Sequence, residues 1–206
     1  AIKINPKSWK AYNGRAWNKS ILEDDKGAIY DYTKSIELNT NQSDVYVNRG
    51  LNKENLKDFK GALNDYTKAI EIDPNIWQAY AARGYSKAQL KDFNGAIEDY
   101  SFALKLNPDN IFSYENRGEA KKNLEDYLGA IEDYSKAIEL NPNDSYNYFE
   151  LGWLKAEIQD HEGAIESYTK AIQLNPKDYL AYNNRGGEKE KIRGLDGAID
   201  DYKKAL

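Results

Sequence analysis

The residue types that most often carry out catalysis are scarce in this 206-residue chain. It has one histidine, His161, and no cysteine, which excludes disulfides, thiolate metal sites and a cysteine nucleophile. The carboxylate pairs Asp24–Asp25, Glu125–Asp126 and Asp200–Asp201 fall at expected turns or on solvated helix faces, where no recessed apolar setting would raise a pKa for acid–base chemistry. No phosphate loop, catalytic triad or metal-ligand spacing occurs. We therefore expect no enzyme activity, no cofactor and no metal.

His161 has a structural explanation. It opens an amphipathic segment at a position that Phe59, Phe93 and Tyr127 occupy elsewhere in the chain. Aromatic residues that recur at such a position usually belong to a core. We therefore interpret His161 as a packing residue and not as a catalytic base or a ligand.

A series of arginines and aspartates has a spacing that indicates pairing. Each aspartate follows its arginine by sixteen residues, and in one place Leu151 and Ser167 replace both charges. Losing one partner of a half-buried pair leaves a costly unpaired charge, whereas losing both does not. We predict five half-buried pairs between two helices, the alternative being solvated charges that changed together. The pairs are Arg15–Asp31, Arg49–Asp65, Arg83–Asp99, Arg117–Asp133 and Arg185–Asp201.

All these residues belong to one repeating unit. The stretch from Trp77 to Asn110 recurs every 34 residues, the distance from Tyr80 to Tyr114. A repeat of this length is typical of a stacked array, in which each unit buries its apolar side against its neighbours. We predict one elongated domain over 1–206. It contains the tail of a preceding helix at 1–4, the repeats 9–42, 43–76, 77–110, 111–144 and 145–178, and an incomplete repeat at 179–206.

Each repeat is predicted to be a hairpin of two helices. In the third repeat, apolar or small residues recur every three to four positions over 77–90 and again over 93–106, which is the helical period. Pro108 ends the second helix because proline has no N–H. Gly84, inside the first helix, costs about 1 kcal/mol relative to alanine, so we expect the second helix to approach closely there. The predicted fold class is all-α.

The repeated residues resemble the tetratricopeptide repeat signature over essentially the whole chain. The resemblance rests on Y-x-x-x-G, A-x-x-x-Y-x-x-A and proline, which stand in the third repeat as Tyr80, Gly84, Ala96, Tyr100, Ala103 and Pro108. The chain departs from the family at Arg83 and Lys87 and their equivalents, where leucine and tyrosine are common. The resemblance implies a right-handed superhelical solenoid of antiparallel helical hairpins, with the first helices on the concave side, that acts as a protein-interaction scaffold.

The outward positions of the two helices differ in how much they vary. On the second helix they scarcely change, as at Glu132 and Glu166, which indicates a solvated convex face. On the first helix, two positions four residues apart carry varied and often aromatic residues, richest in the fifth repeat. The resemblance places them in the concave groove, where we predict that they bind a peptide or helix of a partner, although packing between first helices is the alternative. The predicted residues at these two positions are Asn13, Trp17, Val47, Leu51, Ala81, Tyr85, Glu115, Glu119, Phe149, Trp153 and Asn183. Tyr146 on the same face of the fifth repeat, and Phe112 of the fourth repeat beside it, complete the predicted set.

Composition narrows the choice of partner. With 29 basic and 34 acidic residues and no basic run, the chain is not expected to bind nucleic acid. No apolar run approaches the length of a membrane span. Some members of the resembled family grip a chaperone's C-terminal carboxylate with lysines on successive first helices. Here those positions hold Val47, Leu51 and Ala81, so chaperone tails are not expected partners.

The two ends of the sequence resemble each other. Ala1–Ile2 and Ala205–Leu206 occupy the same position of the repeat, inside a second helix. We interpret the chain as a fragment whose uncapped ends can stack head to tail with other copies. Self-assembly, and a role as the repeat-containing arm of a larger protein or enzyme, therefore stay open beside partner binding. Localisation stays open too, with the cytoplasm favoured.

Overall fold

The computed structural model describes residues 7–206, and every regular element in this range is an α-helix. Odd-numbered helices are the first helices of the repeats and even-numbered helices the second. They are α1 (Trp9–Ile21), α2 (Asp25–Leu38), α3 (Ser43–Asn55), α4 (Phe59–Ile72), α5 (Trp77–Gln89), α6 (Phe93–Leu106), α7 (Ile111–Asn123), α8 (Tyr127–Leu140), α9 (Ser145–Glu157), α10 (His161–Leu174), α11 (Tyr179–Lys191) and α12 (Leu195–Ala205). The all-α class is confirmed, and the odd-numbered helices begin at Trp9, Ser43, Trp77, Ile111, Ser145 and Tyr179. The predicted helical tail at 1–4 lies outside the described residues.

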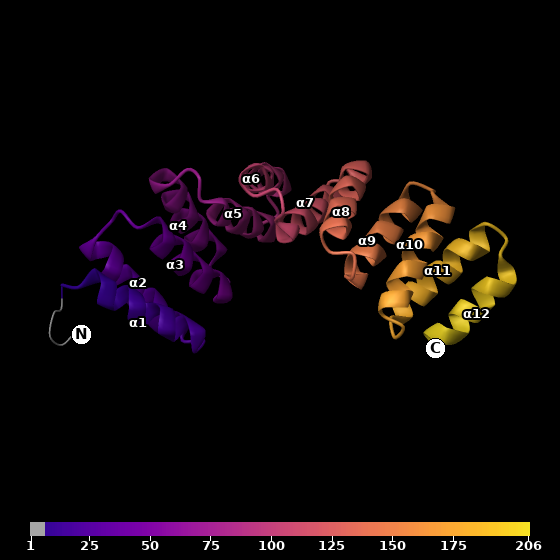
Figure 1. Ribbon diagram of the computed structural model, residues 1–206, viewed down its shortest axis with the longest axis horizontal. Helices are drawn as coiled ribbons and strands as arrows, with labels where there is room; N and C mark the ends of the chain where they lie inside the picture. The colour runs from indigo at the N-terminus through magenta and orange to yellow at the C-terminus, as the bar shows by residue number, and fades with distance from the viewer. Residues whose placement is uncertain (1–6) are drawn as a thin grey trace. The chain divides into compact units, whose positions relative to one another are not determined.

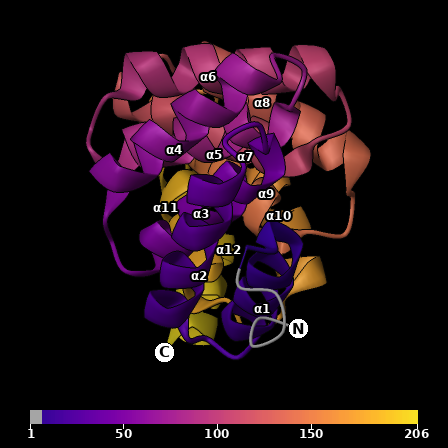
Figure 2. The ribbon, with the colours of Figure 1, turned by 90° about the vertical axis from the view of Figure 1, so that its left-hand side faces the viewer.

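The helices fall into two compact units, which divide between Pro108 and Asp109. The first unit contains α1 to α6 and the second α7 to α12. Within a unit each helix packs against its neighbours in sequence. Successive first helices also touch: α1 with α3, α3 with α5, α9 with α11, and α7 with α9 through side-chain contacts. Both views of the first unit show the α3–α4 hairpin beside the α1–α2 hairpin (Figures 1 and 2). The continuous solenoid over 1–206 stays a prediction.

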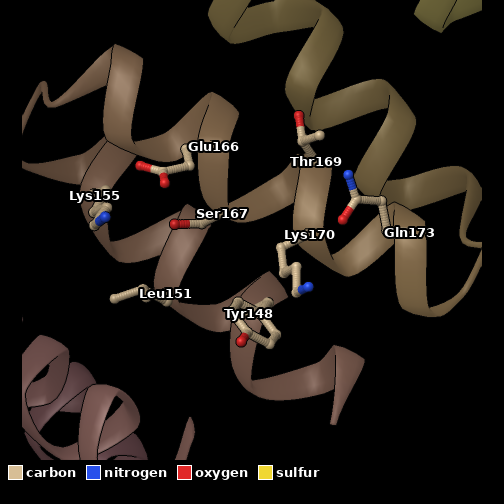
Figure 3. Close-up of a pocket in the computed structure, with 8 residues that line it drawn as sticks. All are labelled: Tyr148, Leu151, Lys155, Glu166, Ser167, Thr169, Lys170 and Gln173. Carbon is tan, nitrogen blue, oxygen red and sulfur yellow. The ribbon is translucent and has the colours of Figure 1, made fainter. Parts of the chain in front are cut away.

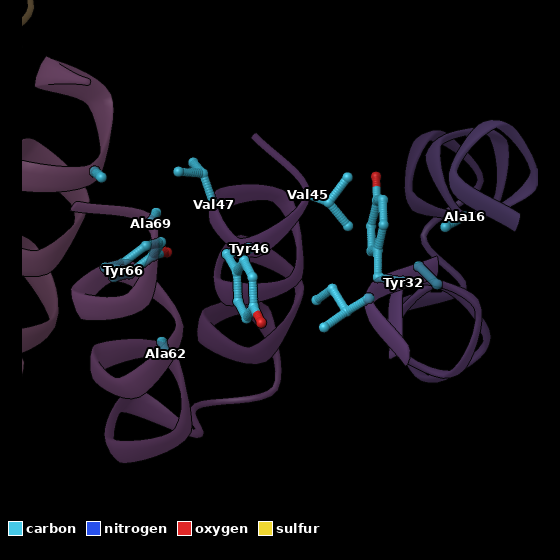
Figure 4. Close-up of a cluster of buried hydrophobic side chains, with 11 residues drawn as sticks. Ala16, Tyr32, Val45, Tyr46, Val47, Ala62, Tyr66 and Ala69 are labelled. Carbon is cyan, nitrogen blue, oxygen red and sulfur yellow. The ribbon is translucent and has the colours of Figure 1, made fainter. Parts of the chain in front are cut away.

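The core of each hairpin forms around one tyrosine of the second helix. Tyr32, Tyr66, Tyr100, Tyr134 and Tyr168 are at most 1% exposed. In Figure 4, the Tyr32 ring lies between Val45 of α3 and Ala16 of α1. The glycine of the first helix faces this ring, since a methyl group on Gly50 would lie 2.5 Å from Cε1 of Tyr66. The predicted close approach of the two helices at these glycines is confirmed.

Aspartates cap the second helices of the first five repeats. The Oδ1 atom of Asp92, for example, accepts a hydrogen bond of 3.0 Å from the N–H of Gly95. A side chain at Gly95 would collide with this cap, because its Cβ would lie 2.3 Å from Oδ2 of Asp92. The negative carboxylate also favours the positive end of the helix dipole. The capping residues are Asp24, Asp58, Asp92, Asp126 and Asp160.

The turn inside each hairpin depends on one residue with a left-handed backbone. Lys91 has a φ of 65°, and the N–H of Asp92 donates back to the carbonyl of Lys87 at 2.9 Å. This motif satisfies carbonyls at the end of the first helix. Glycine is the usual residue in such a turn, yet here all six positions carry longer side chains. They are Glu23, Lys57, Lys91, Glu125, Gln159 and Arg193.

The sixth repeat lacks the aspartate cap. Gly194 precedes α12 and makes no side-chain hydrogen bond. We expect Gly194→Asp to raise the free energy of unfolding by about 1 kcal/mol, because it restores an acceptor for the first turn. Urea unfolding measures this change. Gly194→Ala is the matched control, because it adds the same Cβ, 3.3 Å from the Lys189 carbonyl, without a carboxylate. Equal stability of the two variants would contradict the capping role.

Candidate functional site

The charged residues of each repeat form a cluster between its two helices. In the third repeat, Asp99 accepts from Nε and Nη2 of Arg83 at 2.8 and 2.7 Å, and its Oδ2 lies 2.8 Å from Nζ of Lys87. The Arg83 guanidinium lies 5.6 Å from the centre of the Tyr80 ring. Lys87 Nζ also donates to the carbonyl of Gly95 at 3.2 Å. The predicted Arg–Asp pairs are confirmed in all five repeats, and the lysine joins them.

The clusters of the first and sixth repeats lower the pKa of their aspartates. Burial alone would raise the pKa of Asp31, but hydrogen bonds from Arg15 and Lys19 hold it below its ordinary value. The same balance lowers the pKa of Asp201 in the sixth repeat. A carboxyl group with a lowered folded pKa stabilises the fold above its unfolded pKa, and this contribution is lost as the pH falls. In these two repeats the cluster therefore stabilises the hairpin through a charged carboxylate held between its two helices.

The outward side chains of α7, α9 and α11 form the first-helix face of the second unit. Near its centre, Nζ of Lys122 lies 2.5 Å from Oε2 of Glu119 and 2.7 Å from Oε2 of Glu150. The same ammonium group lies 5.4 Å from the centre of the Trp153 ring, which also makes an edge contact with Tyr127. Burial alone would lower the pKa of Lys122, but the two carboxylates raise it. Trp153 is thus held in one orientation by a charged network.

A cavity of about 350 Å³ opens on this face between α9 and the start of α11. Tyr146 and Leu180, one on each side, are both 48% exposed. Phe149 lies deeper, with its ring centre 5.7 Å from that of Tyr168. Carboxylates of Glu150 and Asp178 also line the cavity. Its chemistry suits an apolar side chain whose neighbours donate hydrogen bonds.

The structure separates the predicted binding residues by their accessibility. Val47 and Ala81 are 7% and 4% exposed. Both pack in the core and offer little surface to a partner, which makes them the weakest members of the predicted set. The others reach the surface to different extents. Trp17, Leu51, Phe112, Tyr146 and Asn183 are exposed, and Asn13, Tyr85, Glu115, Glu119, Phe149 and Trp153 are half-buried.

Polar side chains also link neighbouring first helices, which the sequence analysis missed. The Ser86 hydroxyl donates to Oε1 of Glu54 at 2.5 Å in the first unit, and Nδ2 of Asn147 donates to Oε1 of Glu115 at 2.8 Å in the second. Burial raises the pKa of Glu54, and the hydrogen bond from Ser86 opposes this shift. Both links join residues 32 positions apart. A search of the sequence for pairs of polar residues 32 positions apart could have predicted these links.

His161 does more than pack. Its Nδ1 lies 2.7 Å from Oε2 of Glu188 on the next first helix, and Nζ of Lys191 lies 2.9 Å from the other carboxylate oxygen. Glu188 is only 6% exposed. The interpretation of His161 as a packing residue was therefore incomplete, because it also links α10 to α11 by a polar contact.

Between Lys7 and Leu206, no group of three or more histidine, aspartate or glutamate side chains is arranged to hold a metal ion. Within the same range, no helix is both long enough and apolar enough to cross a membrane.

Sequence models of repeat families match the chain in several places. Models described as tetratricopeptide repeat match residues 43–76, 111–144 and 134–166. A model described as TPR repeat matches 84–125 and 154–187. A comparison with curated protein sequences gives no significant match. The matched segments include residues of every repeat from the second to the sixth.

Solved structures of similar proteins agree with these matches. A crystal structure of MamA has 30% sequence identity to the chain and a TM-score of 0.74, and the alignment covers 76% of this chain and 92% of MamA. YrrB, described as a TPR protein with an unusual peptide-binding site, has 24% identity, a TM-score of 0.77 and coverages of 84% and 90%. PilF of Pseudomonas aeruginosa has 17% identity, a TM-score of 0.77 and coverages of 94% and 88%. The last two similarities concern the fold alone.

Proposed function

Because the chain belongs to the tetratricopeptide repeat family, whose fold supports a protein-interaction scaffold, we propose that its first-helix face binds a peptide or helix of a partner protein without catalysing a reaction. The face of the second unit is the better candidate site. The observation that carries the proposal is the open aromatic surface around Tyr146, beside a cavity of about 350 Å³.

Two properties of this surface favour binding over simple packing. Tyr146 and Leu180 keep about half of their surface accessible, although they border a cavity that an apolar side chain can fill. Large amphipathic rings in partly enclosed positions contribute strongly to protein interfaces. Trp153 is already oriented by Lys122 and Tyr127, so less conformational entropy is lost when a partner binds. The first-helix face of the second unit therefore combines an apolar cavity beside Tyr146 with the preorganised ring of Trp153.

The test uses peptides selected against the protein from a random phage-displayed library. We expect Tyr146→Ala and Trp153→Ala each to weaken binding of the selected peptides by about tenfold or more, the usual effect of losing an aromatic anchor. Fluorescence anisotropy measures the affinity, and circular dichroism checks that helicity is unchanged. Tyr146→Ala is the cleaner variant, because Trp153 also packs on the core around Tyr134 and Leu154.

Tyr30→Ala is the matched control. Tyr30 is 58% exposed but lies on α2, a second helix of the first unit. Its loss removes an equally accessible tyrosine without touching the first-helix face, so the affinity should not change. Selected peptides that bind both the Tyr146 and the Trp153 variants with full affinity would place the binding surface elsewhere and overturn the proposal.

A further inference from the structure

The fifth repeat leaves one lysine without its acidic partner. In the fourth repeat, Nζ of Lys121 lies 2.8 Å from Asp133 and donates to the carbonyl of Gly129 at 3.1 Å. The equivalent Lys155 has neither contact. Ser167 replaces the aspartate. Its hydroxyl donates at 2.8 Å to the carbonyl of Gly163, which is the equivalent of the Gly129 carbonyl that accepts from Lys121. Among the described residues, the Nζ atom of Lys155 thus has no hydrogen-bonding or ionic partner.

A second lysine of the same repeat has also lost its partner. On α8, Nζ of Lys136 lies 2.6 Å from Glu139, and Lys34 and Lys68 form the same contact with the glutamate three residues on. On α10 the equivalent of Lys136 is Lys170, but Gln173 stands where the glutamate would be. Two separate replacements of an acid by a neutral residue have therefore left two lysines of one hairpin unpaired.

The two lysines line one cavity. It has a volume of about 510 Å³ and lies between α9 and α10, on the side of α9 opposite Tyr146. Figure 3 shows Lys155 and Lys170 on either side of Ser167, with Tyr148 and Leu151 below them. In the other repeats an arginine lies over the equivalent tyrosine, whereas here the uncharged Leu151 stands at the arginine position beside Tyr148. The remaining lining residues are Glu166, Thr169 and Gln173.

From these contacts we propose that this cavity, which we call the fifth-repeat cavity, binds an acidic segment of a partner protein. A glutamate or aspartate carboxylate of the partner replaces the missing Asp at Nζ of Lys155 and also contacts Lys170. An adjacent apolar side chain packs on Tyr148 and Leu151. Glu166 is the one acid in the lining, and no ion pair joins it to either lysine within the described residues. The site is thus net positive, which complements an acidic ligand.

This surface is separate from the first-helix face. Positions 148, 151 and 155 lie on the opposite side of α9 from 146, 149 and 153, because each is displaced by two residues along a helix with 3.6 residues per turn. A scaffold with both surfaces can hold two partners at once. The inference therefore goes beyond the proposed function and does not depend on it.

The probe is a short fluorescein-labelled peptide that contains Glu-Leu-Glu, compared with its Gln-Leu-Gln analogue at low salt. We expect the glutamate peptide to bind, with a Kd below about 1 mM, and the glutamine peptide to bind at least about tenfold more weakly. Lys155 and Lys170 should show the largest shifts in NMR spectra of the lysine side chains. No binding of the glutamate peptide, or equal binding of both peptides, would overturn the proposal.

Two variants separate the cavity from other lysine-rich surfaces. Ser167→Asp supplies an internal carboxylate to Lys155, and Leu151→Arg with Ser167→Asp rebuilds the ordinary cluster and covers Tyr148. Both variants should weaken binding of the glutamate peptide about tenfold or more. The double variant should be at least as stable as the parent protein, so unfolding cannot explain the loss. Unchanged affinity in both variants would contradict the site.

The fourth repeat allows a gain-of-function test. Arg117→Leu, Asp133→Ser and Glu139→Gln together reproduce the fifth-repeat residues around Tyr114, Lys121 and Lys136. We expect this variant to bind two glutamate peptides instead of one, as measured by isothermal titration calorimetry. A stoichiometry that stays at one would overturn the assignment. If instead Tyr146→Ala abolishes binding of the glutamate peptide and Ser167→Asp does not, the first-helix face holds it and the fifth-repeat cavity does not.

Discussion

Replacing Asp99 with serine while Arg83 remains is expected to lower the free energy of unfolding by about 3 kcal/mol, as when one partner of a buried ion pair is removed. Asp99 is 2% exposed and accepts from both Arg83 and Lys87. Its loss leaves two cations in a half-buried space with no acid to balance them. Urea unfolding monitored by circular dichroism gives the value.

Removing both charges should cost much less than the sum of the two single changes. We expect Arg83→Leu with Asp99→Ser to show a coupling energy of about 2 kcal/mol in a double-mutant cycle, within the range for residues of one network. The fifth repeat already contains this combination in Leu151 and Ser167. The surface pair Lys68–Glu71, about half exposed, is the matched control, and we expect its coupling to be several-fold smaller because solvent screens the two charges. Additive effects at Arg83 and Asp99 would contradict a coupled pair.

Two alanine substitutions at glycine should change stability in opposite directions. Gly50→Ala places a methyl group 2.5 Å from the buried Tyr66 ring, and we expect it to lower the free energy of unfolding by about 1–2 kcal/mol through overpacking. Ala16 occupies the equivalent position in the first repeat, so a hairpin can form around one methyl group. The variant should therefore fold with reduced stability.

Gly14→Ala is the matched control in α1. No atom outside the local helix backbone lies within 4 Å of the added Cβ, so only helix propensity changes. We expect a gain of about 0.5–1 kcal/mol, because alanine loses less backbone entropy than glycine in a helix. Thermal or urea unfolding of both variants gives the comparison. A destabilised Gly14 variant, or a stabilised Gly50 variant, would show that contact with tyrosine does not explain these glycines.

The repeats made the fold readable from the sequence. Helices begin at Trp9 and Ser43, the first residues of two predicted repeats. A pattern of apolar residues that recurs in every repeat predicts a helix more securely than a single occurrence, which can arise by chance. The reason for Gly84 also followed, since a glycine kept inside a helix needs a contact to explain it. The turns were different. Lys91 and Glu125 have no intrinsic preference for a left-handed backbone, so no local signal revealed them.

The candidate surfaces could be predicted only in part. Helical periodicity gives the direction of a side chain but not its depth, which is why Val47 and Ala81 were assigned to the groove although neighbouring helices cover them. The outward positions of the second helices, which include Lys170 and Gln173, were interpreted as a solvated face. Lys170 and Gln173 line a cavity together with Lys155 and Ser167, and the Ser167 hydroxyl bonds to the Gly163 carbonyl and not to Lys155. The loss of a partner at Lys155 could be recognised only by comparison with the structures of the other repeats. There the equivalent lysine and the arginine both contact the same aspartate.

The restriction of contacts to nearby helices also bears on how the protein folds. Within each unit, the extensive contacts join helices that are neighbours in sequence or successive first helices, such as α1 with α3 and α9 with α11. Relative contact order is consequently low, a property associated with rapid folding. Each hairpin can nucleate without waiting for a remote segment, and growth can proceed from several starting points. We therefore expect the chain to fold along several parallel pathways, with the most stable hairpins forming first.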